Sequence, residues 1–129
     1  MKNFGATGRK TTGFASPAQG YDERAIDFNS LLVKHPAATF IFRLESGDLE
    51  DLGVPRRALL VVDRSVKPVI NDFAVIRHDG LFLCRLLAAR KGCTVFTDGR
   101  NDITPGDGDT EIIGKVTSYV KEMSHDFSY

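Results

Sequence analysis

The sequence has no net charge and no long hydrophobic run, and each absence excludes a class of protein. It carries 17 basic and 17 acidic residues, so its formal net charge is zero. A protein that grips nucleic acid by neutralising phosphates needs a positive surface, so we expect no direct sequence-specific binding to nucleic acid. The run from Leu81 to Ala89 is interrupted by Arg85 and is far shorter than the ~20 residues that cross a membrane. Because no apolar segment follows Met1-Lys2-Asn3, we expect neither a secretory signal nor membrane contact, and we place the protein in the cytoplasm.

Cysteine and histidine are also scarce. Cys84 and Cys93 fall in two separate predicted strands, and we expect buried free thiols, with a disulfide as the alternative. The three histidines have no carboxylate or cysteine at metal-ligand spacing, so we expect neither a metal nor a cofactor. Residues 98–109 are rich in Asp and Gly, but their order fits no calcium loop and Pro105 interrupts them. We therefore expect this stretch to be a solvated loop between strands.

What is present fits one small domain with a polar segment at each end. The chain has 129 residues, of which 42% are hydrophobic, and this is enough for a single core. Residues 1–26 are rich in glycine and poor in large apolar side chains, which predicts a flexible N-terminal arm. Residues 27–122 are predicted to form the folded domain, and residues 123–129 a polar tail.

The pattern of the folded domain indicates one short helix followed by strands. Asp27 offers an N-cap and Pro36 disfavours helix at the residue before it, so the helix is predicted over residues 27–34. Asp79-Gly80 is a strong signal for a two-residue hairpin. Strands are predicted at residues 39–44, 58–62, 73–77, 81–87, 93–97 and 112–120, the last alternating strictly between two faces. The sequence therefore predicts a mostly-β domain, either a folded-over sheet or a partial barrel.

The acidic turn from Glu45 to Gly53 links an aromatic strand to a buried apolar strand. Catalytic groups are often displayed at such a position. The turn holds four acids in nine residues, and Ser46 is its one serine. Taken alone, this composition is more often a solvated turn than a paired-carboxylate site.

Several runs of residues resemble the UmuD branch of the LexA-type Ser-Lys self-cleaving peptidases. They are Gly13 to Ala18, Ile26 to Thr39, Leu59 to Asp63, Asn71-Asp72, Asp79-Gly80, Ile113 to Val116 and Val120-Lys121. The resemblance implies a LexA/UmuD C-terminal-domain fold of curled, largely antiparallel sheets, with one short N-terminal helix and a flexible N-terminal arm. It also implies a homodimer.

The resemblance implies a role as well as a fold. In this family the protein's own serine cuts an N-terminal arm when RecA filaments form on single-stranded DNA. The trimmed dimer then joins an error-prone Y-family polymerase for translesion synthesis. For this chain we therefore expect a role in the SOS response and DNA-damage tolerance.

The residues that match the family's reaction sites do not fit that reaction. The family nucleophile lies in a Ser-Gly-Asp-Ser-Met turn; an ungapped alignment places Asp48 at that serine, and a shifted alignment leaves the serine deleted. Arg85 takes the place of the lysine base, and a guanidinium with a pKa of about 12.5 or more cannot act as one. Thr12-Gly13 takes the cleavage position, where the family has Ala or Cys before the glycine.

These departures predict a pseudo-peptidase with no catalytic residue. If the alignments hold, Asp48 and Arg85 face each other at the place of the dyad. We expect them to form a salt bridge; the alternative is that both point to solvent.

Three functions are therefore considered. The first is an inactive homodimer that contacts a UmuD-type paralogue, a Y-family DNA polymerase or a RecA filament. The second is an active peptidase with a shifted site, in which Ser46 is the nucleophile and Lys34 or Lys67 the base. The third is an anti-repressor-like regulator that binds a LexA-type repressor; no helix-turn-helix precedes the core.

Overall fold

The computed structural model describes residues 26–106 and 108–123. The chain divides into two units between Leu31 and Leu32. The helix α2 (Phe28–Leu32) is capped as predicted, because the Asp27 carboxylate accepts hydrogen bonds from the Asn29 backbone N–H and the Ser30 hydroxyl. The helix ends at Leu32 rather than at residue 34. Pro36 keeps His35 out of helical geometry and begins the 3-10 turn η1 (Pro36–Ala38), but it does not account for the two residues lost before it.

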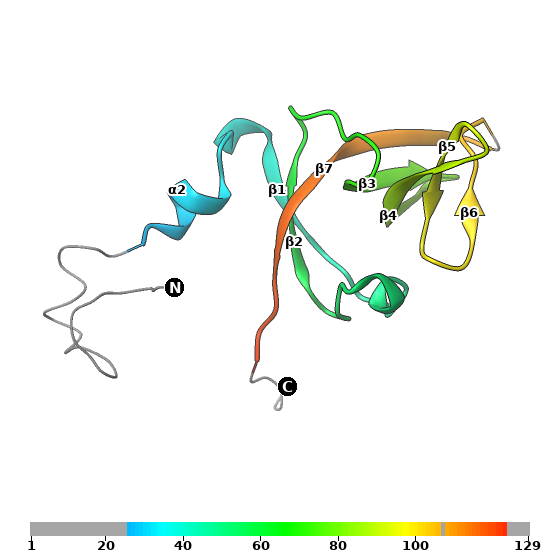
Figure 1. The fold of residues 1–129 in the computed structure, drawn as a ribbon. Coiled ribbons are helices and arrows are strands. Elements are labelled where there is room, and N and C mark those ends of the chain that lie inside the picture. Colours follow the sequence, from blue (N-terminus) through cyan, green and yellow to red (C-terminus); the bar gives the residue numbers. More distant parts are fainter. Residues whose placement is uncertain (1–25, 107, 124–129) are drawn as a thin grey trace, which may run out of the picture. The chain divides into compact units, whose positions relative to one another are not determined.

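The unit that begins at Leu32 is built on an antiparallel sheet. Its strands are β1 (Thr39–Arg43), β2 (Leu59–Asp63), β3 (Phe73–His78), β4 (Leu81–Arg90), β5 (Cys93–Thr97), β6 (Asp102–Ile103) and β7 (Thr110–Val120). Across the described residues they form one seven-stranded sheet in the order β1-β2-β7-β3-β4-β5-β6 (Figure 1). The predicted mostly-β fold is therefore confirmed.

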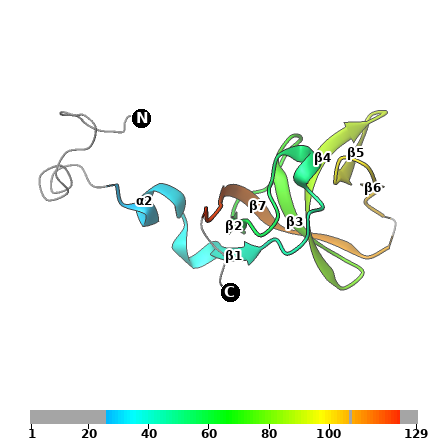
Figure 2. The ribbon, with the colours of Figure 1, turned by 90° about the horizontal axis from the view of Figure 1, so that it is seen from below.

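The long strand β7 joins the two halves of this sheet. Its first half, Thr110 to Lys115, pairs with β3, and its second half, Lys115 to Val120, pairs with β2. Figure 2 shows β7 passing between these two groups of strands. The register shifts once against each neighbour, so strict alternation along β7 is wrong. Each extra residue is a bulge that bends the strand, and Ile113 and Val116 consequently pack against the same core cluster.

Two clusters of buried side chains form the core. The larger lies between β2, β3, β4 and the connection from β1 to β2 and includes Leu49, Leu60 and Val75. The smaller lies between β3, β4 and β5 and includes Ile76 and Phe96. This division explains how one small sheet buries apolar side chains on both of its faces.

The two cysteines are free, as expected, but only one is buried. Cys84 points into the larger cluster, and burial raises the pKa of its thiol to about 12, against a smaller opposing effect of Arg85. Cys93 is exposed, because it begins β5 directly after the hairpin turn from β4. The expectation of two buried thiols is therefore wrong for Cys93.

Part of the stretch 98–109, predicted as a solvated loop, forms a short strand. This strand is β6, which pairs with β5 through Phe96 and Ile103 and through Thr97 and Asp102. The turn between them is closed by Asp98, whose carboxylate accepts the backbone N–H groups of the residues two and three positions later. A two-residue strand lacks a periodic pattern, so sequence reasoning could not find it. No helix within the described residues is long and apolar enough to cross a membrane.

Candidate functional site

The acidic turn is held in place by the core. Leu49 is fully buried, with 0% of its surface exposed, and it follows Asp48 directly. The turn is closed by hydrogen bonds from the Leu44 N–H to the Ala58 carbonyl (2.9 Å) and from the Arg57 N–H to the Leu44 carbonyl (2.7 Å). The 3-10 turn η2 (Glu50–Leu52) then carries the chain back toward β2. Although its acids face solvent, the turn is therefore a fixed part of the fold.

Asp48 and Arg85 are brought together by this arrangement. Arg85 lies on β4, with 11% of its side chain exposed, and its Nη2 is 3.7 Å from Oδ2 of Asp48. The expected ion pair is therefore present, at the long end of the range for such contacts. The Arg85 Nη1 also donates to the backbone carbonyl of Cys84 at 2.8 Å, which holds the guanidinium against its own strand.

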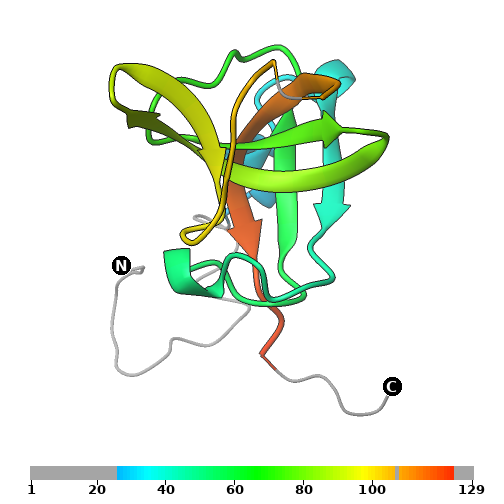
Figure 3. The ribbon, with the colours of Figure 1, turned by 90° about the vertical axis from the view of Figure 1, so that its right-hand side faces the viewer.

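A second ion pair lies on the same turn. The Arg100 Nε donates to Oδ2 of Asp51 at 2.6 Å. A side chain at Gly99 would meet Leu52 at 3.2 Å, so the β5–β6 turn rests closely on η2 (Figure 3). Burial raises the pKa of Asp98, but backbone N–H donors and the nearby Arg85 charge outweigh it and leave that pKa below its usual value. The acidic turn therefore carries two carboxylate–guanidinium pairs, Asp48–Arg85 and Asp51–Arg100.

Ser46, the alternative nucleophile, has no base beside it. Its hydroxyl accepts the Asp48 backbone N–H at 3.4 Å. Within the described part of the chain, neither Lys34 nor Lys67 forms a hydrogen bond to it. A serine nucleophile needs an adjacent base, and among the described residues neither candidate lysine supplies this contact. The vestigial cleavage position, Thr12-Gly13, lies outside the described residues.

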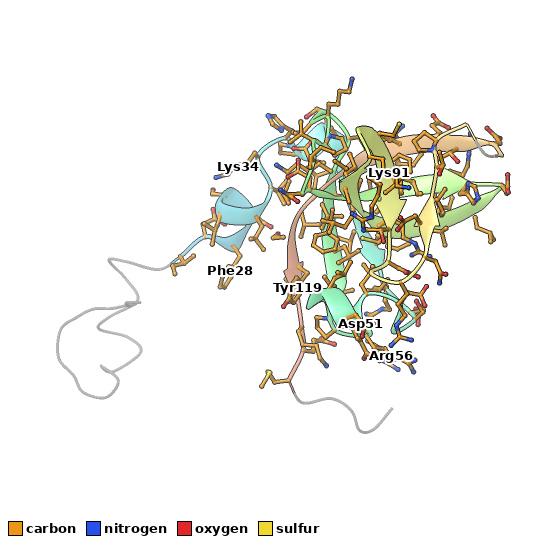
Figure 4. The ribbon with its side chains drawn as sticks, turned by 45° about the vertical axis from the view of Figure 1, so that its right-hand side comes forward. Phe28, Lys34, Asp51, Arg56, Lys91 and Tyr119 are labelled. Carbon is orange, nitrogen blue, oxygen red and sulfur yellow. The ribbon has the colours of Figure 1, made fainter. Side chains whose placement is uncertain are left out.

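A cavity opens beside the turn. It has a volume of about 240 Å³ and lies between the end of η2 and strands β2, β3, β4 and β7. Its lining includes Val54, Phe73 and Tyr119, the last of which is labelled with Asp51 of η2 in Figure 4. Ser118 also lines it, and the Ser118 hydroxyl is buried without a hydrogen-bond partner among the described groups. The lining of the cavity is thus mostly apolar, and the buried Ser118 hydroxyl is one of its few polar groups.

The sequence analysis missed a cluster centred on Asp63. This carboxylate is buried, with 4% exposed; its Oδ2 is 2.5 Å from the His35 Nδ1, and its Oδ1 accepts the Ser65 hydroxyl (2.6 Å) and backbone N–H (2.9 Å). The His35 contact is the main cause that lowers the Asp63 pKa to about 2, and Ser65 adds to it. The spacing of 28 residues carries no signal, because only the pairing of β1 with β2 brings these groups together.

The fold and the site define a mostly antiparallel β-sheet domain with an ion pair at its acidic turn. The sequence profile described as peptidase S24-like matches residues 6–117. The chain therefore belongs to the peptidase S24-like family, and within it to the UmuD-like members of the LexA/UmuD group.

Relatives support the same assignment. Protein SamA of Salmonella typhimurium is 30% identical over 114 residues, which cover 88% of this chain and 81% of SamA. Protein ImpA of Escherichia coli is 40% identical over 82 residues, covering 64% of this chain and 57% of ImpA. Protein MucA of Escherichia coli is 34% identical over 86 residues, covering 66% and 59%. The matched stretch thus spans less than two thirds of ImpA and of MucA.

Proposed function

We propose that this chain is a catalytically inactive, UmuD-like homodimer that acts through protein–protein contacts in the SOS response and translesion DNA synthesis, or in their regulation. The single observation that carries the proposal is the Asp48–Arg85 ion pair. By resemblance, these two residues take the places of the family's serine and lysine. The assignment to the family supports the SOS context.

The chemistry of the pair argues against cleavage. A Ser-Lys dyad needs a hydroxyl next to an amine that can lose its proton when it is desolvated. A guanidinium keeps its proton at any physiological pH. Asp48 offers no hydroxyl group for a base to activate, and its side chain lies beside the guanidinium of Arg85. Neither half of the reaction is therefore supplied at this position.

An inactive subunit can still act by exchange. A chain that cannot be cut, paired with a cleavable UmuD-type paralogue, would change the proportion of dimers able to join a Y-family polymerase. The effect needs only a preserved fold and contact surface. The core that holds the acidic turn supplies such a fold even though the dyad positions have changed.

The proposal is tested by mixing the purified chain with a UmuD-type protein. Size-exclusion chromatography and crosslinking should detect a mixed dimer, and pull-down should detect binding to a Y-family polymerase or a RecA filament. A Leu49→Ala variant, which weakens the core beneath the turn, serves as a folding control. Failure to form mixed dimers together with failure to bind any of these partners contradicts the proposal.

A further inference from the structure

The sheet has two edges, and they differ in length and protection. At one edge, β6 is only two residues long and carries Asp102. At the other edge, β1 has five residues, a charge only at its last residue, Arg43, no proline and a regular register with β2. Natural proteins usually protect a long sheet edge with a charge, a bulge or a cover, because unpaired backbone groups attract another strand. Within the described residues, the outer edge of β1 has no paired strand.

The direction of the backbone groups on β1 follows from its contacts with β2. The Leu44 N–H donates to the Ala58 carbonyl, and the Ala38 carbonyl accepts the Arg64 N–H, so even-numbered residues face β2. Odd-numbered residues therefore direct their N–H and C=O groups outward. The Thr39 N–H is already taken by the Pro36 carbonyl, which leaves its carbonyl available. Ile41 and Arg43 present both of their backbone groups.

We propose that a second copy of this chain pairs antiparallel with this edge, β1 against β1, about a two-fold axis at Ile41. In this register the two Ile41 residues exchange both backbone hydrogen bonds. Each Arg43 N–H then donates to the Thr39 carbonyl of the other copy. The Thr39 N–H already donates to the Pro36 carbonyl. In this register the Arg43 carbonyl of the other copy therefore receives no hydrogen bond from Thr39.

The side chains of β1 complement one another in the same register. Ile41 is 56% exposed and meets its own copy across the axis, while Phe40 lies opposite Phe42. Apolar and aromatic cross-strand pairs stabilise sheets. Arg43 lies opposite Thr39, so no like charges are opposed. A closed two-fold contact of this kind uses one patch twice, as homodimers generally do. The inference rests on the proposed homodimer and gives that homodimer a contact surface.

A charge exchange at the axis tests this register. Ile41→Lys and Ile41→Glu each place two like charges against one another in a homodimer, but oppose opposite charges when the two variants are mixed. Mass measured by light scattering should fall from dimer to monomer for each variant alone and return to dimer in the mixture. Val69→Lys, at a site that is 63% exposed and lies in the connection between β2 and β3, is the matched control and should remain dimeric.

The possible results separate this inference from the proposed function. If the parent chain dimerises and Ile41→Lys dimerises equally well, the β1 surface is wrong and the homodimer stands. If both variants lose the dimer and mixing does not restore it, the edge receives another strand, such as one from residues 1–25, and the inference is overturned. If the parent chain is monomeric at every concentration, both the inference and the proposed homodimer are overturned.

Discussion

Two aspartate contacts in this molecule, His35–Asp63 and Asp48–Arg85, differ in almost every physical respect. Asp63 is buried, accepts two hydrogen bonds from Ser65 and contacts His35 at 2.5 Å. Asp48 has 44% of its side chain exposed and meets Arg85 at 3.7 Å through a single pair of atoms. The first pair joins the start of β1 to the end of β2, whereas the second lies on the surface of the acidic turn.

The difference indicates which positions the fold depends on. A buried carboxylate must keep its partners, because an unsatisfied charge in the interior is costly. An exposed carboxylate can be exchanged at little cost to stability. Asp48, the more exposed member of its pair, is therefore a position where substitution should cost little stability.

The largest expected effect comes from the core residue beneath the acidic turn. Leu49→Ala removes a fully buried side chain and should destabilise the protein by about 2–5 kcal/mol. Urea unfolding followed by circular dichroism measures this loss. Leu81→Ala, at a leucine that is 64% exposed, is the control and should change stability by less than about 0.5 kcal/mol. Equal effects at both leucines would contradict a turn anchored by the core.

The next largest effect is expected when the contact between His35 and Asp63 is broken. Asp63→Asn keeps the size of the side chain but removes the charge that holds His35 and Ser65. The urea midpoint should fall clearly further than it does for Asp48→Asn. Hydrogen exchange should also show loss of protection at the Arg64 N–H, which bonds to Ala38 beside the cluster. If Asp48→Asn proves the more damaging change, the comparison between the two pairs is wrong.

The pH dependence sharpens the same comparison. An aspartate has a pKa of about 3.9 when unfolded, and in the folded protein the Asp63 pKa is lowered to about 2. Its contribution to stability is therefore complete above about pH 3.9 and is lost as the pH falls toward 2. Urea midpoints measured from pH 5 to pH 2 should fall more steeply for the parent chain than for Asp63→Asn. Parallel curves would show that Asp63 carries no such linkage.

The smallest effect belongs to the pair at the dyad positions. A double-mutant cycle with Asp48→Asn and Arg85→Met should give a coupling energy below about 1 kcal/mol, because the carboxylate is exposed and the contact is long. Methionine at position 85 removes the charge of the arginine but retains a long apolar side chain on β4. A coupling energy of several kcal/mol would mean that this pair is a structural element of the fold.

Local signals in the sequence predicted much of the fold. Asp27 capped its helix as expected, and the hairpin at Asp79-Gly80 has positive φ at both residues, as a two-residue turn requires. The Asp48–Arg85 contact also followed from the resemblance. The bulges of β7 and the strand β6 depend on pairing between distant strands, so no local pattern revealed them. The His35–Asp63 contact was missed for the same reason.

The most direct test of the central claim is the intact mass of the chain after incubation with RecA, ATP and single-stranded DNA. A cleavable UmuD-type protein in the same reaction shows that the filaments are active, and a Ser46→Ala variant controls for the one serine of the turn. The account predicts that the full mass of the chain remains unchanged. Loss of residues 1–12 from the parent chain but not from Ser46→Ala would contradict it and establish an active peptidase.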